Sequence, residues 1–400
     1  MSTPRLARAS VSVVVRVRAA LVCLVALALG CASAPWRRDR VGITVDDLRA
    51  GAPLGVGQDS PALVGDEAVL AVSAEMQDFL NVHVARTAGR VTRLRQLARA
   101  IVGEARFGLE YDETTRTAAE TFRTRRGNCL SFSNMFVAMA RRVDLDVDYQ
   151  EVDVPPDWSF KDDAFVLNRH VNVRLNLGKE GEHVVDFNMD DFRTTYDRRA
   201  ISDARALAHF YNNLAVERMR AGDTASALVY FRRATVHDTR FSPAWTNLGI
   251  LYLRKGHPDH AEAAYLQALK ADGGDLVAMS NLANLYERRG DQERAALYRS
   301  RVADHRERNP YYRFQLAREA FLAQDYDAAI GHLKYAVREK KNEDQFCFLL
   351  GRSYLKKGDE PAARRWLSRA EEVAATDALK RRYSDKIDIL LSAPPAEDRP

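Results

Sequence analysis

Small and apolar residues recur every 34 positions through the C-terminal half of the chain. Glycine stands at 222, 256, 290 and 358, and Gln324 occupies the place where the series calls for another. The same register holds two alanine series and one leucine series: Ala227, Ala261, Ala295, Ala329 and Ala363; Ala234, Ala268, Ala336 and Ala370; Leu214, Leu248, Leu282, Leu316 and Leu350. This period is typical of stacked pairs of helices joined by a glycine turn. It predicts five repeats over residues 205–377, a capping helix over 378–391 and a disordered tail over 392–400.

Helical spacing also appears before the repeats. Apolar residues within 73–103 follow the spacing of a helix face. Further on, Phe132, Phe136, Met139 and Val143 are spaced by four, three and four residues, which predicts a second helix with one apolar face. Asn128 is a favourable N-cap for this helix, so Cys129 is expected at the first helical position.

The period then changes from helical to alternating. In HVNVRLNL, residues 170–177, His170 and Asn172 share the polar face, while Val171 and Val173 share the apolar one. Glycines 178 and 181 separate this strand from EHVVDFN at 182–188, which predicts a hairpin. A turn centred near Gly178 would set His170 opposite Asp186, whereas a turn centred on residues 179 and 180 would set Asp186 opposite Val173.

The N-terminus has the pattern of an export signal. Arginines precede the apolar run AALVCLVALALG, residues 19–30, which is too short to span a bilayer comfortably but fits a signal-peptide core. The run ends in Ala28-Leu29-Gly30-Cys31, which resembles a bacterial lipobox, although Ala28 replaces the usual leucine. By that resemblance residues 1–30 are removed and Cys31 carries the lipid. A plain secretory signal cut near Ala34 is the alternative.

The lipoprotein interpretation sets expectations for location and for the next segment. Ala32 replaces the aspartate that would retain a lipoprotein in the inner membrane, so the expected location is the outer membrane, facing the periplasm. Residues 31–72 contain Pro, Gly and charges with little periodicity, which predicts a tether.

Composition excludes several classes of protein. The 400 residues are 46% hydrophobic and 29% charged, as in an ordinary globular chain, and the net charge of +5 arises from interleaved helical charges rather than a nucleic-acid motif. After export and acylation, Cys129 and Cys347 remain as thiols. They form no disulfide framework or zinc spacing, and we expect no metal or organic cofactor. Cys347 occupies the position that Trp245 holds in its own repeat, so we expect it in the core.

Two family resemblances follow from these patterns. The unit SPAWTNLGILYLRKGHPDHAEAAYLQAL is similar to the tetratricopeptide repeat. RGNCLSFSNMFVAMARR, NRHVNVRL and HVVDFN are similar to the three motifs of the bacterial transglutaminase-like superfamily. The resemblance implies a papain-like α+β domain, over residues 73–200, followed by the all-α repeat solenoid.

The second resemblance also implies a catalytic triad. Cys129 would be the nucleophile, His170 the base and Asp186 the residue that orients the histidine. His183 is a rival base if the hairpin register shifts. One departure is Val171-Asn172, where many relatives carry Ala-Trp, so an aromatic side chain near the histidine is missing.

The site also has candidate substrate contacts. Trp158, in EVDVPPDWSF at 151–160, and Asn128 are the two that we consider, although the Pro-Pro stretch could equally be a rigid loop packed on the sheet.

The expected function is amide hydrolysis by a membrane-anchored cysteine enzyme, with a protein or peptide substrate held by the repeats. Protein cross-linking is the alternative within the enzyme class. A non-catalytic scaffold, in which the repeats recruit a partner, is the alternative outside it.

Overall fold

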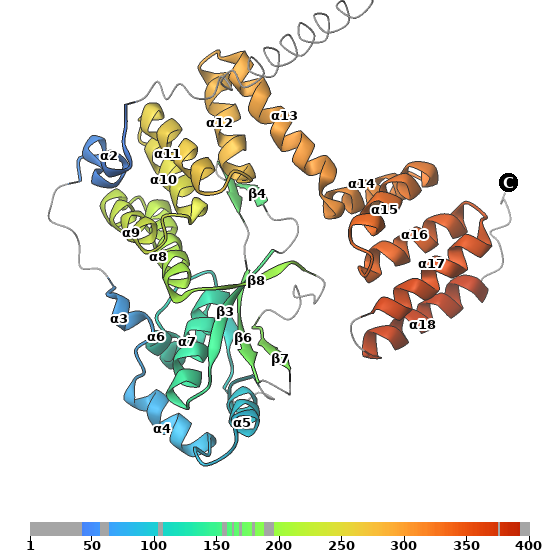
Figure 1. Cartoon of the computed structure of the whole chain (residues 1–400), viewed down its shortest axis with the longest axis horizontal. Helices are drawn as coiled ribbons and strands as arrows, with labels where there is room; N and C mark the ends of the chain where they lie inside the picture. The colour runs from blue at the N-terminus through green and yellow to red at the C-terminus, as the bar shows by residue number, and fades with distance from the viewer. Residues whose placement is uncertain are drawn as a thin grey trace, which may run out of the picture. The chain divides into compact units, whose positions relative to one another are not determined.

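The computed structural model describes residues 42–56, 64–102, 107–153, 158–161, 164–167, 170–177, 181–187, 196–374 and 377–392. A mixed α/β region comes first and a long run of consecutive helices follows, which confirms the predicted fold class (Figure 1). The predicted signal peptide, Cys31 and residues 393–400 of the predicted tail lie outside the described residues. In the ranges given above, no helix is long and apolar enough to cross a membrane.

Part of the predicted tether is folded. Helix α2 (Val45–Ala50), a 3₁₀ helix (Ala52–Leu54) and α3 (Asp66–Val69) lie within it. Leu48 is 1% exposed, and the hydroxyl of Tyr252 donates a hydrogen bond of 2.7 Å to its carbonyl. The tether prediction is therefore wrong for these residues. A six-residue helix with one buried side chain is too short to show a helical period.

The helical region predicted over 73–103 consists of two helices, α4 (Ala74–His83) and α5 (Arg90–Val102). Val84 ends the first helix in an extended conformation, and Gly89 immediately precedes the second. Helix α6 (Ala118–Thr124) follows, and the short strands β1 (Glu110–Tyr111) and β2 (Arg126–Gly127) pair in parallel on either side of it in sequence.

A four-stranded antiparallel sheet lies beside the cysteine helix α7 (Cys129–Arg142). Its strand order is β7-β6-β3-β8, made of β7 (Glu182–Val185), β6 (His170–Asn176), β3 (Val147–Val152) and β8 (Arg198–Ile201). A separate hairpin pairs β4 (Trp158–Lys161) with β5 (Ala164–Leu167). The predicted hairpin of 170–177 with 182–188 is thus present as β6 and β7.

Helix α7 is buried on nearly all sides. Every residue from Leu130 to Ala140 is buried, because α7 contacts α4 and α6 as well as β3 and β6. The sequence predicted only one apolar face, since serines and an asparagine interrupt the others. Two of these polar groups bond to the sheet: Ser133 Oγ donates to the carbonyl of Val171 at 3.1 Å, and Asn134 Oδ1 accepts from the Tyr149 hydroxyl at 2.7 Å.

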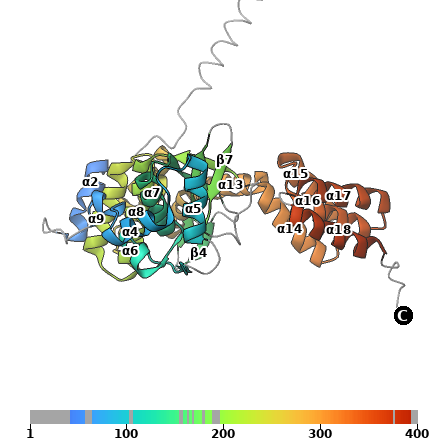
Figure 2. The same ribbon diagram turned by 90° about the horizontal axis from the view of Figure 1, so that it is seen from below.

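Between residues 203 and 373, all of which the structure describes, ten helices form five successive pairs. They are α8 (Asp203–Arg220), α9 (Thr224–His237), α10 (Ser242–Arg254), α11 (Pro258–Ala271), α12 (Leu276–Arg288), α13 (Gln292–Arg308), α14 (Pro310–Leu322), α15 (Tyr326–Glu339), α16 (Asp344–Lys356) and α17 (Glu360–Val373). Helix α18 (Asp377–Ser392) then packs on α17 through Tyr383 and Ile387. Helices α14 to α18 stack against one another in turn (Figure 2).

The turn positions of the 34-residue series share one backbone conformation. Glycines 222, 256, 290 and 358 have φ of 80°, 80°, 76° and 84°, and Gln324 has φ of 61°. Gln324 therefore adopts the left-handed conformation that the series required of a glycine. The recurring alanines are fully buried, and so is Cys347, as predicted. Leu316 is only half-buried; the buried residue of α14 is its neighbour Ala317.

Strand β3 and helix α8 are joined by a buried charge. The Glu151 side chain is 0% exposed, and its Oε1 lies 2.6 Å from His209 Nε2 and 3.7 Å from Arg205 of α8. Arg199 of β8 also pairs with Glu151. A buried carboxylate needs such partners, so the sheet and the first helix of the repeats are held together by this group.

Candidate active site

Cys129 lies at the first position of α7, as predicted. Asn128 Oδ1 accepts a hydrogen bond of 2.9 Å from the N–H of Ser131, which is the expected cap. Gly127 sits against this first turn, and a Cβ at that position would lie 2.6 Å from Cβ of Ser131. The glycine of the RGNC sequence is therefore needed for the close approach of β2 to α7, and the thiol is presented at a helix N-terminus.

His170 and Asp186 form a buried pair. Nε2 of His170 lies 2.8 Å from both Oδ1 and Oδ2 of Asp186, and the two residues are 9% and 5% exposed. In the hairpin register, Val173 pairs with Val185 and Arg174 with Val184. Continuing this register sets Asp186 opposite Asn172, between the two alternatives that the sequence left open. His170 and Asp186 are thus diagonal neighbours on one face, within reach of their side chains.

Cys129 and His170 are coupled. Burial raises the pKa of the Cys129 thiol, but a hydrogen bond and charge attraction from His170 outweigh it, so that the thiol pKa lies below its ordinary value. Burial likewise lowers the pKa of His170, while hydrogen bonds and charge from Asp186 and Cys129 raise it to about 10. The lowered pKa of the thiol and the raised pKa of the histidine both favour a thiolate paired with an imidazolium. Since Nε2 faces Asp186, Nδ1 is the ring nitrogen that remains available to the thiol.

Asn172 is a site residue whose role the sequence did not predict. Its side chain is 0% exposed, and Nδ2 donates a hydrogen bond of 2.8 Å to Oδ2 of Asp186. The alternation along β6 already placed Asn172 on the face of His170. Its link to Asp186 depends on the hairpin register, which the sequence left open.

His183 lies apart from this pair. It pairs with Leu175 across the hairpin, so it belongs to the apolar face of β6 rather than the face of His170 and Asn172. The register therefore does not favour His183 as the rival base.

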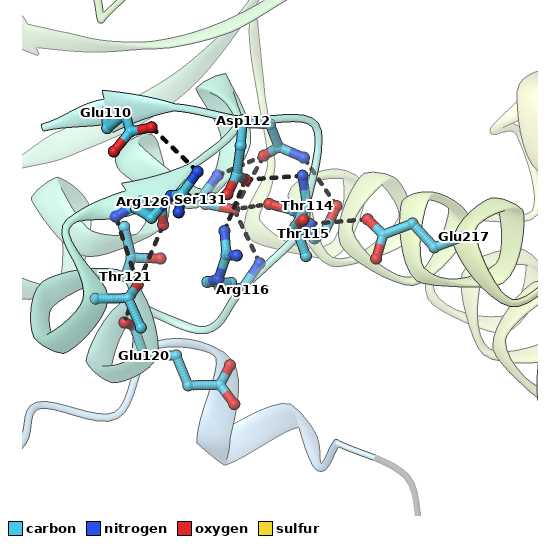
Figure 3. Close-up of polar contacts among 12 residues, drawn as sticks. Glu110, Asp112, Thr114, Thr115, Arg116, Glu120, Thr121, Arg126, Ser131 and Glu217 are labelled. Atoms are coloured by element: carbon cyan, nitrogen blue, oxygen red, sulfur yellow. Dashed lines mark hydrogen bonds and ion pairs between the residues drawn. The ribbon is translucent and has the colours of Figure 1, made fainter.

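A polar network supports the turn before Cys129. Asn128 is 7% exposed, and its Nδ2 donates to Thr115 Oγ1 at 2.8 Å. The N–H of Thr115 in turn donates to Glu217 Oε1 of α8 at 2.8 Å, and burial raises the pKa of Glu217 despite this bond. Figure 3 shows Glu217 reaching Thr115 in this way. The side-chain oxygen and nitrogen of Asn128 thus both have partners inside the protein, and its predicted contact with substrate stays a prediction.

The same network extends along the loop between β1 and α6. The N–H of Arg116 donates to Ser131 Oγ at 2.9 Å, and its guanidinium pairs with Asp112 at 2.7 Å. Thr117 and Glu120 form a capping box at the start of α6. The loop thereby holds the first turn of α7 through side chains of several residues (Figure 3).

Trp158 begins strand β4, but its side chain lies outside the described residues. The predicted substrate contact at this position therefore stays a prediction. No group of three or more His, Cys, Asp or Glu side chains in the described part of the chain is arranged to hold a metal ion.

Family models match both halves of the chain. Residues 81–175 match the transglutaminase-like superfamily, a range that contains Cys129 and His170 and ends before Asp186. Residues 242–275 and 320–381 match the tetratricopeptide repeat. Both resemblances inferred from the sequence are thereby confirmed. No curated protein matches the chain.

Solved structures of repeat proteins resemble the chain weakly. YrrB, described as a TPR protein with an unusual peptide-binding site, is 18% identical, with 44% of this chain and 92% of that chain covered and a TM-score of 0.24. MamA is 17% identical over 44% and 95%, with a TM-score of 0.24. PilF of Pseudomonas aeruginosa is 16% identical over 48% and 86%, with a TM-score of 0.25. At these TM-scores the likenesses carry no argument about this chain.

Proposed function

We propose that this chain, which joins a transglutaminase-like domain to tetratricopeptide repeats, is a cysteine-dependent acyl-transfer enzyme that hydrolyses an amide in a protein or peptide. The observation that carries the proposal is the coupling of Cys129 to a buried His170–Asp186 pair. The hydrogen bond and charge attraction between Cys129 and His170 lower the thiol pKa and raise the histidine pKa, which favours the protonation states that acyl transfer requires.

The reaction has two steps. The Cys129 thiolate attacks the amide carbonyl carbon, and the carbon–nitrogen bond breaks as His170 gives its proton to the departing amine. A thioester on Cys129 remains. His170, now neutral, takes a proton from water, and the resulting hydroxide attacks the thioester to release a carboxylic acid and the thiolate. Asp186 holds the ring orientation and stabilises the imidazolium.

The oxyanion of each tetrahedral intermediate needs donors near Cys129. The N–H groups of Cys129 and Leu130 belong to the first turn of α7, where the helix itself supplies no acceptor. They would stabilise the negative oxygen as it forms. If an amine rather than water attacked the thioester, the product would be a cross-link.

The repeats and the N-terminus complete the proposal. Tetratricopeptide repeats generally bind proteins or peptides, and here they would hold the substrate or a partner.

The lipobox-like sequence supports export and acylation of Cys31, with the enzyme anchored to a membrane facing the periplasm. Mass spectrometry of the N-terminal peptide tests this, since a Cys31→Ala variant should lose the lipid and leave the membrane fraction.

Alkylation across pH tests the catalytic proposal directly. The rate of iodoacetamide labelling of Cys129, followed by peptide mass spectrometry, should rise with pH and show its inflection below the ordinary cysteine pKa of about 8.5. His170→Ala should return the inflection toward that value. Cys347 is the internal control, because burial raises its pKa to about 11 and it should react slowly in both proteins. An ordinary inflection that His170→Ala leaves unchanged would exclude this mechanism.

Products then distinguish the reactions. Wild type and Cys129→Ala, incubated with periplasmic proteins in water enriched in heavy oxygen, should differ by new carboxyl groups that carry the heavy isotope. New isopeptide bonds instead would show cross-linking. Equal product patterns, with a reactive Cys129, would favour the non-catalytic scaffold.

A further inference from the structure

A groove lies between α15 and α17, the second helices of two successive repeats. Its volume is about 850 Å³, within the range of pockets that hold ligands. The side chains on its rim are mostly cationic: Lys334, Arg338, Lys341, Arg365 and Arg369. None of these residues belongs to the candidate active site, so the groove needs a separate explanation.

The charge of the groove is strongly unbalanced. Glu372 is the one acidic residue among its described lining residues, and it pairs with Arg369 at 2.8 Å. Arg338 pairs with Glu339 at 3.0 Å, on the exposed surface. No ion pair joins Lys334, Lys341 or Arg365 to a carboxylate in the described ranges. Cations gathered at a concave site attract a negatively charged ligand.

The floor of the groove is apolar. Trp366 is half-buried and packs against the core cluster of the last two repeats, and Val337 is 8% exposed. The guanidinium carbon of Arg365 lies 5.9 Å from the centroid of the Trp366 ring, within reach of a cation–π contact. A ligand for this site therefore needs an apolar group for the floor as well as negative charges for the rim.

A protein segment fits these requirements better than a bilayer does. A membrane surface presents headgroups in a plane and has no side chain to insert into a groove between two helices. An acidic peptide supplies both features, since an apolar side chain can enter while carboxylates on either side meet the lysines and arginines.

We propose that the groove between α15 and α17 binds an acidic segment of a partner protein. An apolar side chain of the segment lies against Trp366 and Val337, and its carboxylates pair with Lys334, Lys341 and Arg365. This binding site goes beyond the proposed amide hydrolysis and does not depend on Cys129.

Fluorescence anisotropy with the full chain tests this proposal. The probe is a labelled peptide of glutamates around a central leucine, compared with one in which glutamine replaces glutamate and one in which serine replaces the leucine. We expect the first peptide to bind, and each replacement to weaken binding by about tenfold or more. Loss of all discrimination among the three peptides would overturn the proposal.

Charge-reversal variants locate the binding. Lys341→Glu with Arg365→Glu should weaken binding of the acidic peptide by about tenfold or more. The matched control, Lys356→Glu with Arg381→Glu, changes the net charge equally at exposed residues outside the groove, and should stay within about twofold. Equal loss in both variants would show non-specific attraction and contradict a site in the groove.

Vesicles of anionic phospholipid test whether the groove binds a membrane surface instead of a peptide. We expect little binding of the wild-type chain, purified without its lipid, to vesicles at a salt concentration where the peptide binds. Vesicle binding that requires Lys341 and Arg365, with no peptide binding, would assign the groove to a membrane surface and overturn the proposal.

Discussion

At the scale of single residues, Cys129 and His170 stabilise each other's charged form. Because the pKa of Cys129 is lowered, its thiolate persists as the pH falls below the ordinary cysteine pKa. It is protonated only when the pH falls below the lowered pKa of Cys129. The imidazolium persists as the pH rises and is lost near pH 10. We therefore expect the ion pair between these two pH limits, and activity that depends on it should fall on both sides.

Asn172 acts through Asp186 and is a positioning residue. Asn172→Ala removes a hydrogen bond to a charged carboxylate, a bond worth about 1.5–3 kcal/mol. We expect Cys129 alkylation at neutral pH to slow by about tenfold, and the inflection of its rate to move to higher pH. The reason is that Asp186, no longer held by Asn172, orients His170 less firmly. Rates measured across pH check both effects.

Arg174→Ala is the matched control for Asn172→Ala. Arg174 lies two residues further along the same strand and pairs with the half-exposed Asp148 at 2.6 Å. We expect its replacement to leave the inflection unchanged. A slower rate in Asn172→Ala without a shift in the inflection would indicate a structural role alone.

At the scale of elements, close packing of helix pairs depends on small residues. In α10, a Cβ at Gly249 would lie 2.5 Å from Cε1 of Tyr265 in α11. In α15, a Cβ at Gly331 would meet nothing within 4 Å. Both glycines lie inside an α-helix, but Gly249 is buried and faces a neighbouring ring, whereas Gly331 is exposed and has open space beside it.

This difference predicts opposite effects of one substitution. Gly331→Ala should raise the free energy of unfolding by about 0.5–1 kcal/mol, because alanine favours the helix. Gly249→Ala should lower it by about 1–3 kcal/mol, because the overpacked ring must move. Denaturant unfolding of both variants measures the difference. Stabilisation by both would show that Tyr265 moves aside at no cost.

At the scale of the whole molecule, helix α8 links the repeats to the cysteine helix. Glu217 accepts from the N–H of Thr115, Thr115 accepts from Asn128, and Asn128 caps α7. Nearer the start of α8, His209 contacts the buried Glu151 of the sheet. The first repeat is therefore part of the support of the candidate site.

Glu217→Ala tests this link. Losing this half-buried acceptor should lower the free energy of unfolding by about 1–3 kcal/mol and slow Cys129 alkylation, because the cap on α7 loosens. Glu217→Gln keeps a carbonyl acceptor and should change less. Glu113→Ala removes a carboxylate that is 79% exposed and pairs with Arg220 at 3.7 Å, so little effect is expected. Reduced stability with unchanged alkylation would contradict the link to the site.

Much of this architecture could be predicted because it follows from periodic positions. The 34-residue series predicted helix pairs and even the turn at Gln324, since every unit must present the same small and apolar residues to its neighbours. The short helix α2 escaped prediction, because Leu48 gains its burial from repeats more than 180 residues away in the chain. No local pattern records such a contact.

The sequence by itself determined the fold class, the helix-start context of Cys129 and the shared strand face of His170 and Asn172, because local periodicity and capping chemistry dictate all three. Only the tertiary structure decided the hairpin register, which lies between the two alternatives and lets Asp186 reach both His170 and Asn172. A shift of the turn by half a residue changes which side chains meet, and the sequence cannot specify it. The coupling of Cys129 to His170 likewise depends on packing α7 against β6.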